Sequence, residues 1–237
     1  MTTAPTPIET TAAPFATARQ VWSRFQARHG SGRLPLSVKL GFTAFMAVLV
    51  PVYWTHYGPS NFLYFCDMAL IVTLIGIWRE SPLLVSMPAV GILMPQILWI
   101  VDFVLNFGGI HLTGMTDYMF DAAKPLYLRG LSLFHGWLPL LLVFLVAKLG
   151  YDRRALPAWS LLAWVAMLVA YFFFPAPSPA TADAVANINY VYGMSSTAPQ
   201  SYMPGWMWLI AMLVLLPVLM FAPVHWVLGR FYGNRGA

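Results

Sequence analysis

The stretch 57-YGPSNFLYFCDMALIVTLIGIW-78 opens with a turn and continues as an apolar run long enough to cross a bilayer. Near the start of that run, Asp67 stands beside Cys66, the single cysteine of the chain. An ionisable group inside a membrane span is costly, and it faces the bundle interior or a wet cavity. The stretch therefore indicates a membrane-spanning fold, and it marks residues 66 and 67 as candidates for function.

The composition of the whole chain agrees with a membrane protein. Of its 237 residues, 59% are hydrophobic and only 9% are charged, whereas a soluble domain carries about a quarter charged residues. A single cysteine excludes an internal disulfide and a cysteine-rich metal site. The net charge of +5 does not indicate a nucleic-acid partner, because the basic residues fall in loops where membrane topology explains them.

Three regions follow from these patterns. Residues 1–35 begin with a Thr/Ala/Pro-rich stretch that is typical of disorder, followed by 15-FATARQVWSRFQARHG-30. The latter suits either a short helix on an anionic membrane surface or a disordered basic tail. Residues 36–230 form the predicted transmembrane domain, and residues 231–237 form a short cytoplasmic tail.

Six apolar runs are long enough to be transmembrane helices, which predicts an all-α fold, a six-helix bundle. They cover approximately residues 36–54, 61–78, 82–107, 131–149, 156–175 and 204–228. The third run contains Pro88 and Pro95, so we expect this helix to be kinked or tilted.

The basic residues orient the bundle through the positive-inside rule. With the N-terminus in the cytoplasm, eleven of the 13 Lys and Arg residues lie inside and only Lys124 and Arg129 lie outside. The inner set is Arg19, Arg24, Arg28, Arg33, Lys39, Arg79, Lys148, Arg153, Arg154, Arg230 and Arg235. Both termini are therefore predicted to be cytoplasmic (N-in/C-in), and the loops 108–130 and 176–203 are predicted to face outward.

Three ionisable residues are predicted to share one depth in the outer leaflet. Asp67 lies about six residues, or ~9 Å, below the outer end of its span, and Asp102 lies about five residues from the same interface. His135 falls in the first turns of the fourth span. We therefore expect a polar pocket between the second, third and fourth spans.

Helical spacing and the outer loops supply partners for this pocket. Tyr64 precedes Asp67 by three residues, and Gln96, Trp99 and Asp102 follow one another at intervals of three along one helix face. The candidate substrate-binding residues are Tyr64, Gln96, Trp99, Arg129, Asn187, Asn189 and Tyr190.

The candidate catalytic residues are His135, Cys66, Asp67 and Asp102. Histidine is the commonest general base, and a carboxylate on its second nitrogen would set its orientation; Asp67 or Asp102 could do this. Cys66 could be the nucleophile or an inert, buried small side chain. On a helix Cys66 and Asp67 point about 100° apart, which predicts that both cannot face one small site.

The same residues also allow purely structural roles. His135 could serve only as a hydrogen-bonded link between helices, and the two aspartates could be structural anchors. The sequence contains no paired metal-ligand motif such as His-x-x-x-His and no nucleotide-binding fingerprint. No metal and no cofactor are therefore expected.

Three segments resemble a known family: 55-THYGPSNFLYFCDMAL-70, 134-FHGWLPLLL-142 and 187-NINYVYGMSSTAPQSYMPGWMW-208. They are similar to the YwaF-type bacterial integral membrane proteins and, more distantly, to the androgen-induced/ADTRP-type intramembrane lipid hydrolases. The resemblance covers most of residues 40–220 and implies six spans with both termini in the cytoplasm.

The resemblance also implies site residues. In the hydrolase branch a threonine of the second span and a histidine of the fourth cleave fatty-acid esters of hydroxy fatty acids. The histidine corresponds to His135, and Tyr64 stands at the position of the threonine. A related acyltransferase-like branch uses a cysteine beside that point, which corresponds to Cys66.

Two functional hypotheses of different classes result. The first is an intramembrane lipid-ester hydrolase or acyltransferase, in which His135 acts on a membrane lipid; the multi-pass protein would lie in the bacterial plasma (inner) membrane. The alternative is a proton-coupled transporter for a small solute, or a non-catalytic membrane scaffold. The oligomeric state does not follow from the sequence.

Overall fold

The computed structural model describes residues 33–178, 187–195 and 198–233, and the regular structure in these ranges is entirely helical. The expectations for residues 1–32 and for residues 234–237 of the tail lie outside the described residues. The α-helices are α2 (Leu36–Tyr57), α3 (Phe65–Arg79), α4 (Pro82–Phe107), α5 (Leu126–Ser132), α6 (Phe134–Leu149), α7 (Ala155–Phe173), α8 (Gly205–Leu215) and α9 (Ala222–Tyr232). Short 3₁₀ turns η1 (Pro59–Leu63), η2 (Asp117–Met119) and η4 (Ile188–Tyr190) lie between them, and the π-helix η5 (Leu216–Phe221) joins α8 to α9.

Five helical segments are long and apolar enough to cross a membrane. They are Leu36–Tyr57, Pro82–Phe107, Leu126–Leu149, Ala155–Phe173 and Gly205–Tyr232. The second expected span differs, because the 3₁₀ turn η1 precedes an α3 of only 15 residues. At 1.5 Å per residue this α-helix is about 22 Å long, shorter than the ~30 Å hydrocarbon core of a bilayer.

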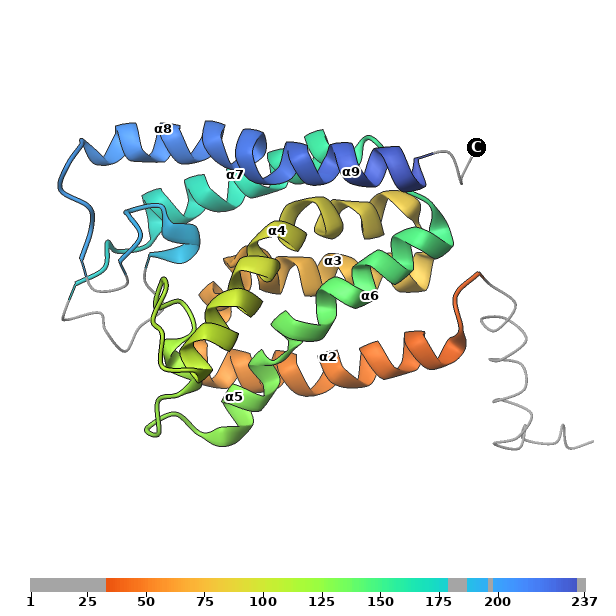
Figure 1. Ribbon diagram of the computed structural model, residues 1–237, viewed down its shortest axis with the longest axis horizontal. Helices are drawn as coiled ribbons and strands as arrows, with labels where there is room; N and C mark the ends of the chain where they lie inside the picture. The colour runs from red at the N-terminus through yellow and green to blue at the C-terminus, as the bar shows by residue number, and fades with distance from the viewer. Residues whose placement is uncertain (1–32, 179–186, 196–197, 234–237) are drawn as a thin grey trace, which may run out of the picture.

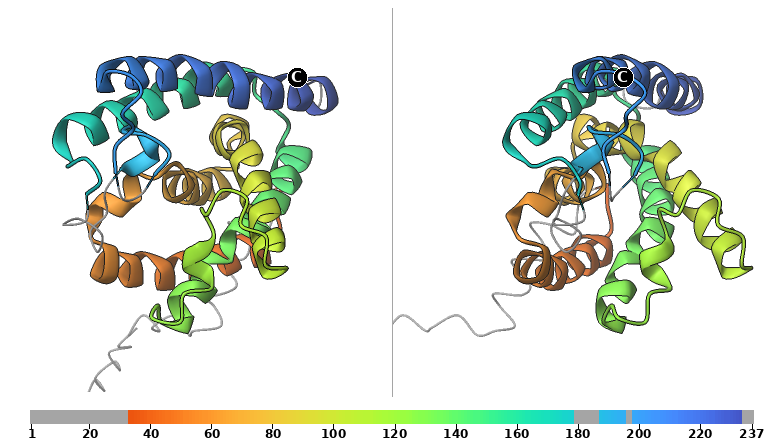
Figure 2. Two further views of the ribbon diagram at one scale, coloured as in Figure 1. Left: turned by 60° about the vertical axis from the view of Figure 1, so that its left-hand side comes forward. Right: turned by 90° about the vertical axis from the view of Figure 1, so that its left-hand side faces the viewer.

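The helices run alternately back and forth along the long axis of the molecule (Figure 1). One end carries Arg33 and the last turn of α9, and we call it the termini end. The other end carries residues 108–125, 187–195 and 198–204, and we call it the loop end. Figure 2 shows α3 and α4 between α2 on one side and the α8–α9 segment on the other.

Helix α4 is the centre of the bundle, because it contacts α3, α6, α7 and α9. It contains Pro88 and Pro95 and bends along its course (Figure 1), as expected where prolines interrupt the helical hydrogen bonds. A Cβ atom on Gly91 would lie 1.8 Å from the ring of Trp159 on α7. Only glycine permits this close approach of the two helices.

A carboxylate joins three segments at the termini end. Glu80, in the turn between α3 and α4, pairs with Lys39 Nζ at 2.8 Å and accepts hydrogen bonds from the backbone N–H groups of Arg33 and Leu34. Lys39 is only 3% exposed. The start of α2 is therefore attached to the α3–α4 turn by a largely buried ion pair.

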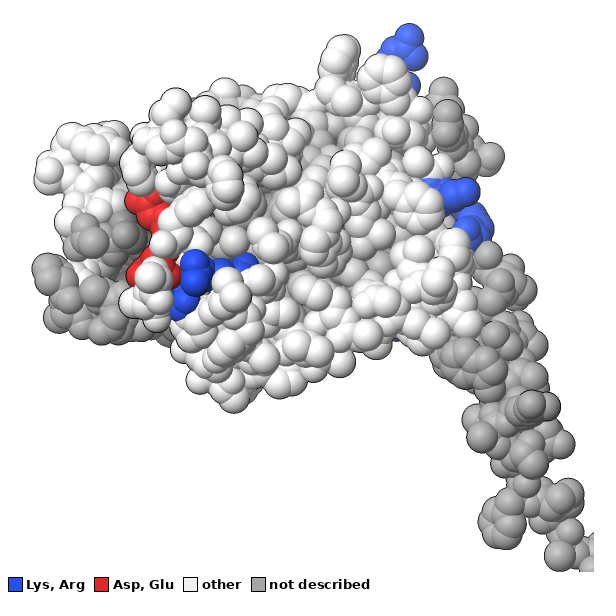
Figure 3. All heavy atoms as spheres, turned by 60° about the horizontal axis from the view of Figure 1, so that its bottom comes forward, with Lys and Arg blue, Asp and Glu red and all other residues white. Residues whose placement is uncertain are grey.

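Charged atoms concentrate at the two ends of the face drawn in Figure 3. Lys and Arg lie at the termini end, both signs of charge lie at the loop end, and the surface between them is uncharged. Large apolar side chains are exposed on this bundle, among them Leu140, Leu161 and Phe172. An apolar surface between two charged ends suits a protein embedded in a bilayer.

Candidate functional site

His135 lies at the loop end, in the first turn of α6. Its Nδ1 is 2.7 Å from the backbone carbonyl oxygen of Ser132, the last residue of α5. A carbonyl oxygen only accepts hydrogen bonds, so Nδ1 carries the proton of the neutral ring. Nε2 then has a free lone pair, and this tautomer is the one that a general base needs.

Aromatic rings hold the imidazole in place. His135 stacks on Trp99 of α4, with ring centroids 4.8 Å apart and planes at 17°, and on its neighbour Phe134 at 4.0 Å. Trp99 in turn stacks on Phe103 at 5.1 Å. The predicted neighbourhood of Trp99 and His135 is therefore present, and the contact is made through ring faces.

Ser132 connects His135 to a group of hydroxyls. Its Oγ lies 2.9 Å from the hydroxyl of Tyr53, which comes from α2 and is 4% exposed. The hydroxyl of Tyr118, from η2, lies beside Ser132 and Trp99. Burial raises the pKa of the Tyr118 phenol, so this group stays neutral and can donate a hydrogen bond.

Sequence reasoning missed Ser132 and Tyr53 as members of the site. Tyr53 and Tyr57 occupy positions i and i+4 near the end of α2, and their rings meet at 5.3 Å. That spacing was the available signal, but a tyrosine near a span end is ordinarily read as part of an aromatic belt. No sequence pattern marked Ser132, because its contact with His135 depends on the break between α5 and α6.

Asp67 is buried in the first turn of α3, with 4% of its surface exposed. Its Oδ2 accepts a hydrogen bond from Asn61 Nδ2 at 3.0 Å, whereas its Oδ1 has no partner among the described residues. Tyr53 and Tyr57 lie within electrostatic range of this carboxyl group. Tyr53 thus lies near both the Asp67 carboxyl group and Ser132. We call the surroundings of these side chains the polar region.

Cys66 also belongs to this region. Its Sγ lies 3.8 Å from Asp67 Oδ2, and that oxygen is also bonded to Asn61. That the two side chains do not face one small site centre stays a prediction. The backbone N–H groups of residues 66 and 67 lie close to the sulfur, and so do the phenols of Tyr53 and Tyr118.

Asp102 occupies a different position from the one expected of an orienting carboxylate. Its Oδ1 accepts from the backbone N–H and hydroxyl of Thr113, both at 2.7 Å. Its Oδ2 accepts from the same two groups of Thr116, at 3.0 and 2.6 Å. Four donors occupy the carboxylate, so Asp102 anchors the loop after α4, while the carbonyl of Ser132 orients His135.

Gln96 and Arg129 point into the protein from two different elements. Gln96 of α4 is 2% exposed, and its Oε1 has no hydrogen-bond partner in the described part of the chain. Arg129 of α5 donates from a terminal nitrogen to the carbonyl oxygen of Met119, while its Nε is buried and unpaired within the described ranges. The Nε1–H of Trp99 makes no hydrogen bond of good geometry within those ranges, although the Tyr118 hydroxyl lies near it.

The two asparagines of the segment after α7 shape the backbone. Asn189 accepts from the N–H of Phe65 at 3.0 Å and donates to the carbonyl of Leu63 at 2.8 Å, so its amide brackets the start of α3. Asn187 donates to the carbonyls of Gly193 and Ser195. Both asparagines adopt a positive φ, a conformation that asparagine tolerates better than most residues.

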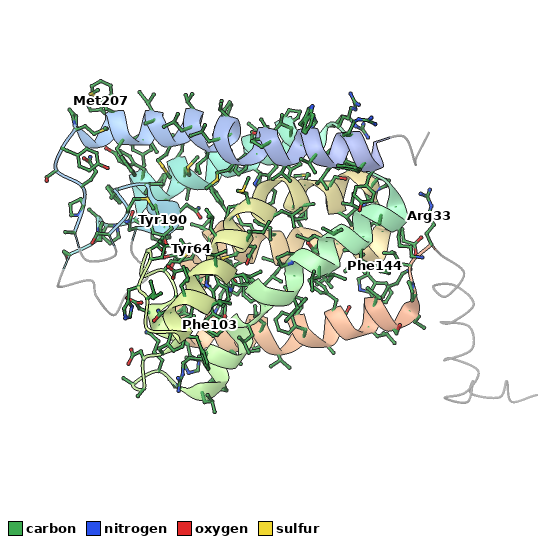
Figure 4. The ribbon with its side chains drawn as sticks, viewed as in Figure 1. Arg33, Tyr64, Phe103, Phe144, Tyr190 and Met207 are labelled. Atoms are coloured by element: carbon green, nitrogen blue, oxygen red, sulfur yellow. The ribbon has the colours of Figure 1, made fainter. Side chains whose placement is uncertain are left out.

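Tyr64 and Tyr190 lie near each other at the loop end (Figure 4). They interact electrostatically, and both lie within range of Cys66. The asparagine bracket thus brings the segment after α7 against the amino end of α3. Within the described ranges, no three His, Cys, Asp or Glu side chains are close enough to hold a metal ion together.

Comparisons with protein-family models, with curated proteins and with solved structures gave no match.

Proposed function

We propose that this chain is an intramembrane enzyme that hydrolyses or transfers the acyl group of a membrane lipid, with His135 as the general base and Cys66 as the nucleophile. One observation carries the proposal. The Ser132 carbonyl holds the Nδ1 proton of His135, which leaves Nε2 unprotonated and free to accept a proton; Tyr53, whose hydroxyl lies 2.9 Å from Ser132 Oγ, is also near Cys66 and Asp67.

We further propose six membrane crossings with both termini in the cytoplasm, in which η1 and α3 together form the short second crossing. The alternating helix directions, with the start of α2 and the end of α9 at a common end (Figure 1), support this topology. The bias of eleven basic residues against two supports its orientation. The site would then lie in the outer leaflet of the bacterial inner membrane, and a lipid would reach it sideways from the bilayer.

The chemistry follows from the side chains. His135 Nε2 takes the thiol proton of Cys66, and the thiolate attacks the ester carbonyl carbon. The tetrahedral intermediate then collapses: the C–O bond to the alcohol breaks, and His135 returns the proton to the departing oxygen. In a second round His135 activates water or an acceptor hydroxyl, which attacks the thioester and releases Cys66.

Several hydrogen-bond donors suit the negative charge that develops on the ester oxygen and on the Cys66 sulfur. Trp99 stacks on the imidazole through its ring, and the neutral hydroxyl of Tyr118 lies near Trp99 and Ser132; preorganised donors such as the indole N–H and this hydroxyl stabilise an oxyanion. The Cys66 sulfur lies close to the N–H groups at the amino end of α3, where the helix dipole favours negative charge. An ionised Asp67 would destabilise the neighbouring Cys66 thiolate by charge repulsion, and a protonated Asp67 carboxyl would not.

One observation favours the alternative, a proton-coupled transporter. Asp67 is buried, one of its oxygens lacks a partner, and it forms no ion pair within the described residues. A carboxyl group in such a place can bind and release a proton during transport. The enzyme proposal takes precedence because it also accounts for the set tautomer of His135.

The test uses the full chain purified in a neutral detergent. An iodoacetamide probe and a fluorophosphonate probe are applied to the wild type, Cys66→Ala and His135→Gln, and release of fatty acid from a lipid ester is followed in parallel. His56→Gln is the matched control, because His56 lies at the same end but bonds to the hydroxyl of Tyr127. Loss of the general base should lower turnover by about 10²–10⁴-fold.

The two mechanisms predict different results. If Cys66 labelling and ester turnover both fall in His135→Gln and persist in His56→Gln, the enzyme proposal stands. Turnover that persists undiminished in His135→Gln contradicts it. Proton-driven uptake into liposomes that is lost in Asp67→Asn, without any ester turnover in the wild type, would establish the transporter instead.

A further inference from the structure

Two adjoining cavities open at the termini end, opposite the site around His135. The larger has a volume of about 390 Å³ and lies between the start of α4 and the α6–α7 turn, with Ser81, Pro82, Tyr151 and Arg153 in its wall. The smaller, about 140 Å³, is lined by Arg153, His225, Trp226, Gly229 and Arg230. Arg153 belongs to both, so the two cavities meet at its side chain.

The charge around these cavities is positive. Asp152 is the carboxylate of the α6–α7 turn, and it is paired with Arg154 at 2.7 Å. This contact holds the pKa of Asp152 below its ordinary value, so the carboxylate is ionised and already neutralised. Neither Arg153 nor Arg230 forms an ion pair in the described ranges. Two guanidinium groups therefore face the cavities without an anionic partner.

Hydrogen bonds to α4 and to α9 fix the backbone of the α6–α7 turn, which carries Arg153. The N–H of Asp152 donates to Ser86 Oγ of α4 at 3.0 Å, and the N–H of Tyr151 donates to the carbonyl of Tyr232. The hydroxyl of Tyr151 lies 2.7 Å from Nδ1 of His225. The α6–α7 turn is thus joined to both α4 and α9, the two elements that complete the cavities.

We propose that these cavities bind a phosphate group through Arg153 and Arg230. A guanidinium fork matches the geometry of phosphate oxygens and can bind two of them at once. Basic pockets between helices at the end of a membrane bundle are a recurrent form of anionic headgroup site. Trp226, which is 70% exposed at the same rim, is the residue type that settles at the headgroup level of a bilayer.

The same phosphate chemistry has two sources, an anionic lipid headgroup or a soluble phosphate. The proposal is independent of the function proposed for the loop end, because the two sites share no residue. Its test measures binding and needs no enzymatic turnover.

The experiment uses the full chain in neutral detergent and counts bound molecules by native mass spectrometry. Phosphatidylglycerol, phosphatidylcholine and inorganic phosphate are titrated separately against the wild type, Arg153→Gln, Arg230→Gln and the double variant. Arg79→Gln is the matched control, because Arg79 is an exposed arginine near the same end that lines neither cavity. Each cavity arginine should contribute roughly fivefold to the affinity for an anionic headgroup, and the pair roughly 25-fold.

The outcomes separate the sources and can overturn the proposal. Binding of phosphatidylglycerol that weakens in the cavity variants and survives in Arg79→Gln identifies a lipid headgroup. Binding of inorganic phosphate alone, with the same dependence on the variants, identifies a soluble ligand. Equal binding of the anionic and zwitterionic lipids, or an equal loss in Arg79→Gln, overturns the proposal. The variant Arg153→Lys/Arg230→Lys keeps the charge, so an intermediate affinity in it shows that the loss is not due to misfolding.

Discussion

Replacing Asp102 by asparagine distinguishes a structural anchor from a catalytic group. The carboxylate is 1% exposed and accepts four hydrogen bonds of 2.6–3.0 Å from Thr113 and Thr116. The asparagine oxygen can retain the two bonds to Thr113, but its NH₂ group then faces the N–H of Thr116. At about 1.5–3 kcal/mol for each hydrogen bond to a charged group, the loss of two bonds lowers the free energy of unfolding by about 3 kcal/mol or more.

The assay is unfolding in mixed micelles of sodium dodecyl sulfate and neutral detergent, followed by circular dichroism. Thr116→Val supplies the second arm of a double-mutant cycle, since it removes the hydroxyl that bonds to Asp102 at 2.6 Å. The two substitutions touch the same bond, so their costs should be less than additive by about 1 kcal/mol. The rate at which iodoacetamide labels Cys66 is measured on the same samples as a readout of the site.

We expect Asp102→Asn to lose much of its stability and to label at Cys66 at a rate close to that of the wild type in the folded protein. The opposite pair of results would contradict the role of Asp102 as an anchor. A change below about 0.5 kcal/mol, which is within the range of ordinary surface substitutions, together with abolished labelling, would return Asp102 to the catalytic group.

The remaining predictions concern packing and pH. Gly91→Ala should destabilise the bundle by about 3 kcal/mol or more in the same unfolding assay, because its Cβ would overlap Trp159. Gly41→Ala is the control, because a Cβ on Gly41 would have no atom within 4 Å. Equal stability of the two variants would contradict the α4–α7 contact. Glu80→Gln should cost about 3 kcal/mol at neutral pH, because it leaves Lys39 buried without its counter-charge. Although partial burial opposes the charged form, hydrogen bonds from Lys39 and from the N–H groups of residues 33 and 34 hold the pKa of Glu80 below its ordinary value. A lowered pKa in the folded state means that this stability is complete above about pH 4.3 and is lost as the pH falls through the folded-state pKa. Unfolding measured from pH 7 to 3 should therefore show the wild type approaching Glu80→Gln at low pH, and a constant difference would argue against the ion pair.

Much of the helical layout could be predicted from the sequence, because an apolar run of sufficient length has few alternatives in a bilayer. Five of the six expected spans appear as helices of membrane-spanning length and composition. The second differs because of a contact distant in sequence: the N–H of Phe65 donates to the Asn189 side chain, and the carbonyl of Leu63 accepts from the same side chain. A residue more than 120 positions away thus determines where α3 begins, and no pattern within residues 57–78 contains that information.

The candidate site divides in the same way. The sequence by itself determined that Asp67, Cys66 and His135 are unusual, since charged and reactive groups are expensive inside apolar runs and stand out against them. Only the tertiary structure decided which groups the candidate residues contact: four donors of a loop bond to Asp102, and the break between α5 and α6 places a carbonyl at His135 Nδ1. Tyr53 and Ser132 joined the site only in three dimensions. The physical reason is that burial cost depends on residue type and can be read along the chain, whereas a hydrogen bond depends on the distance and direction between atoms that folding brings together.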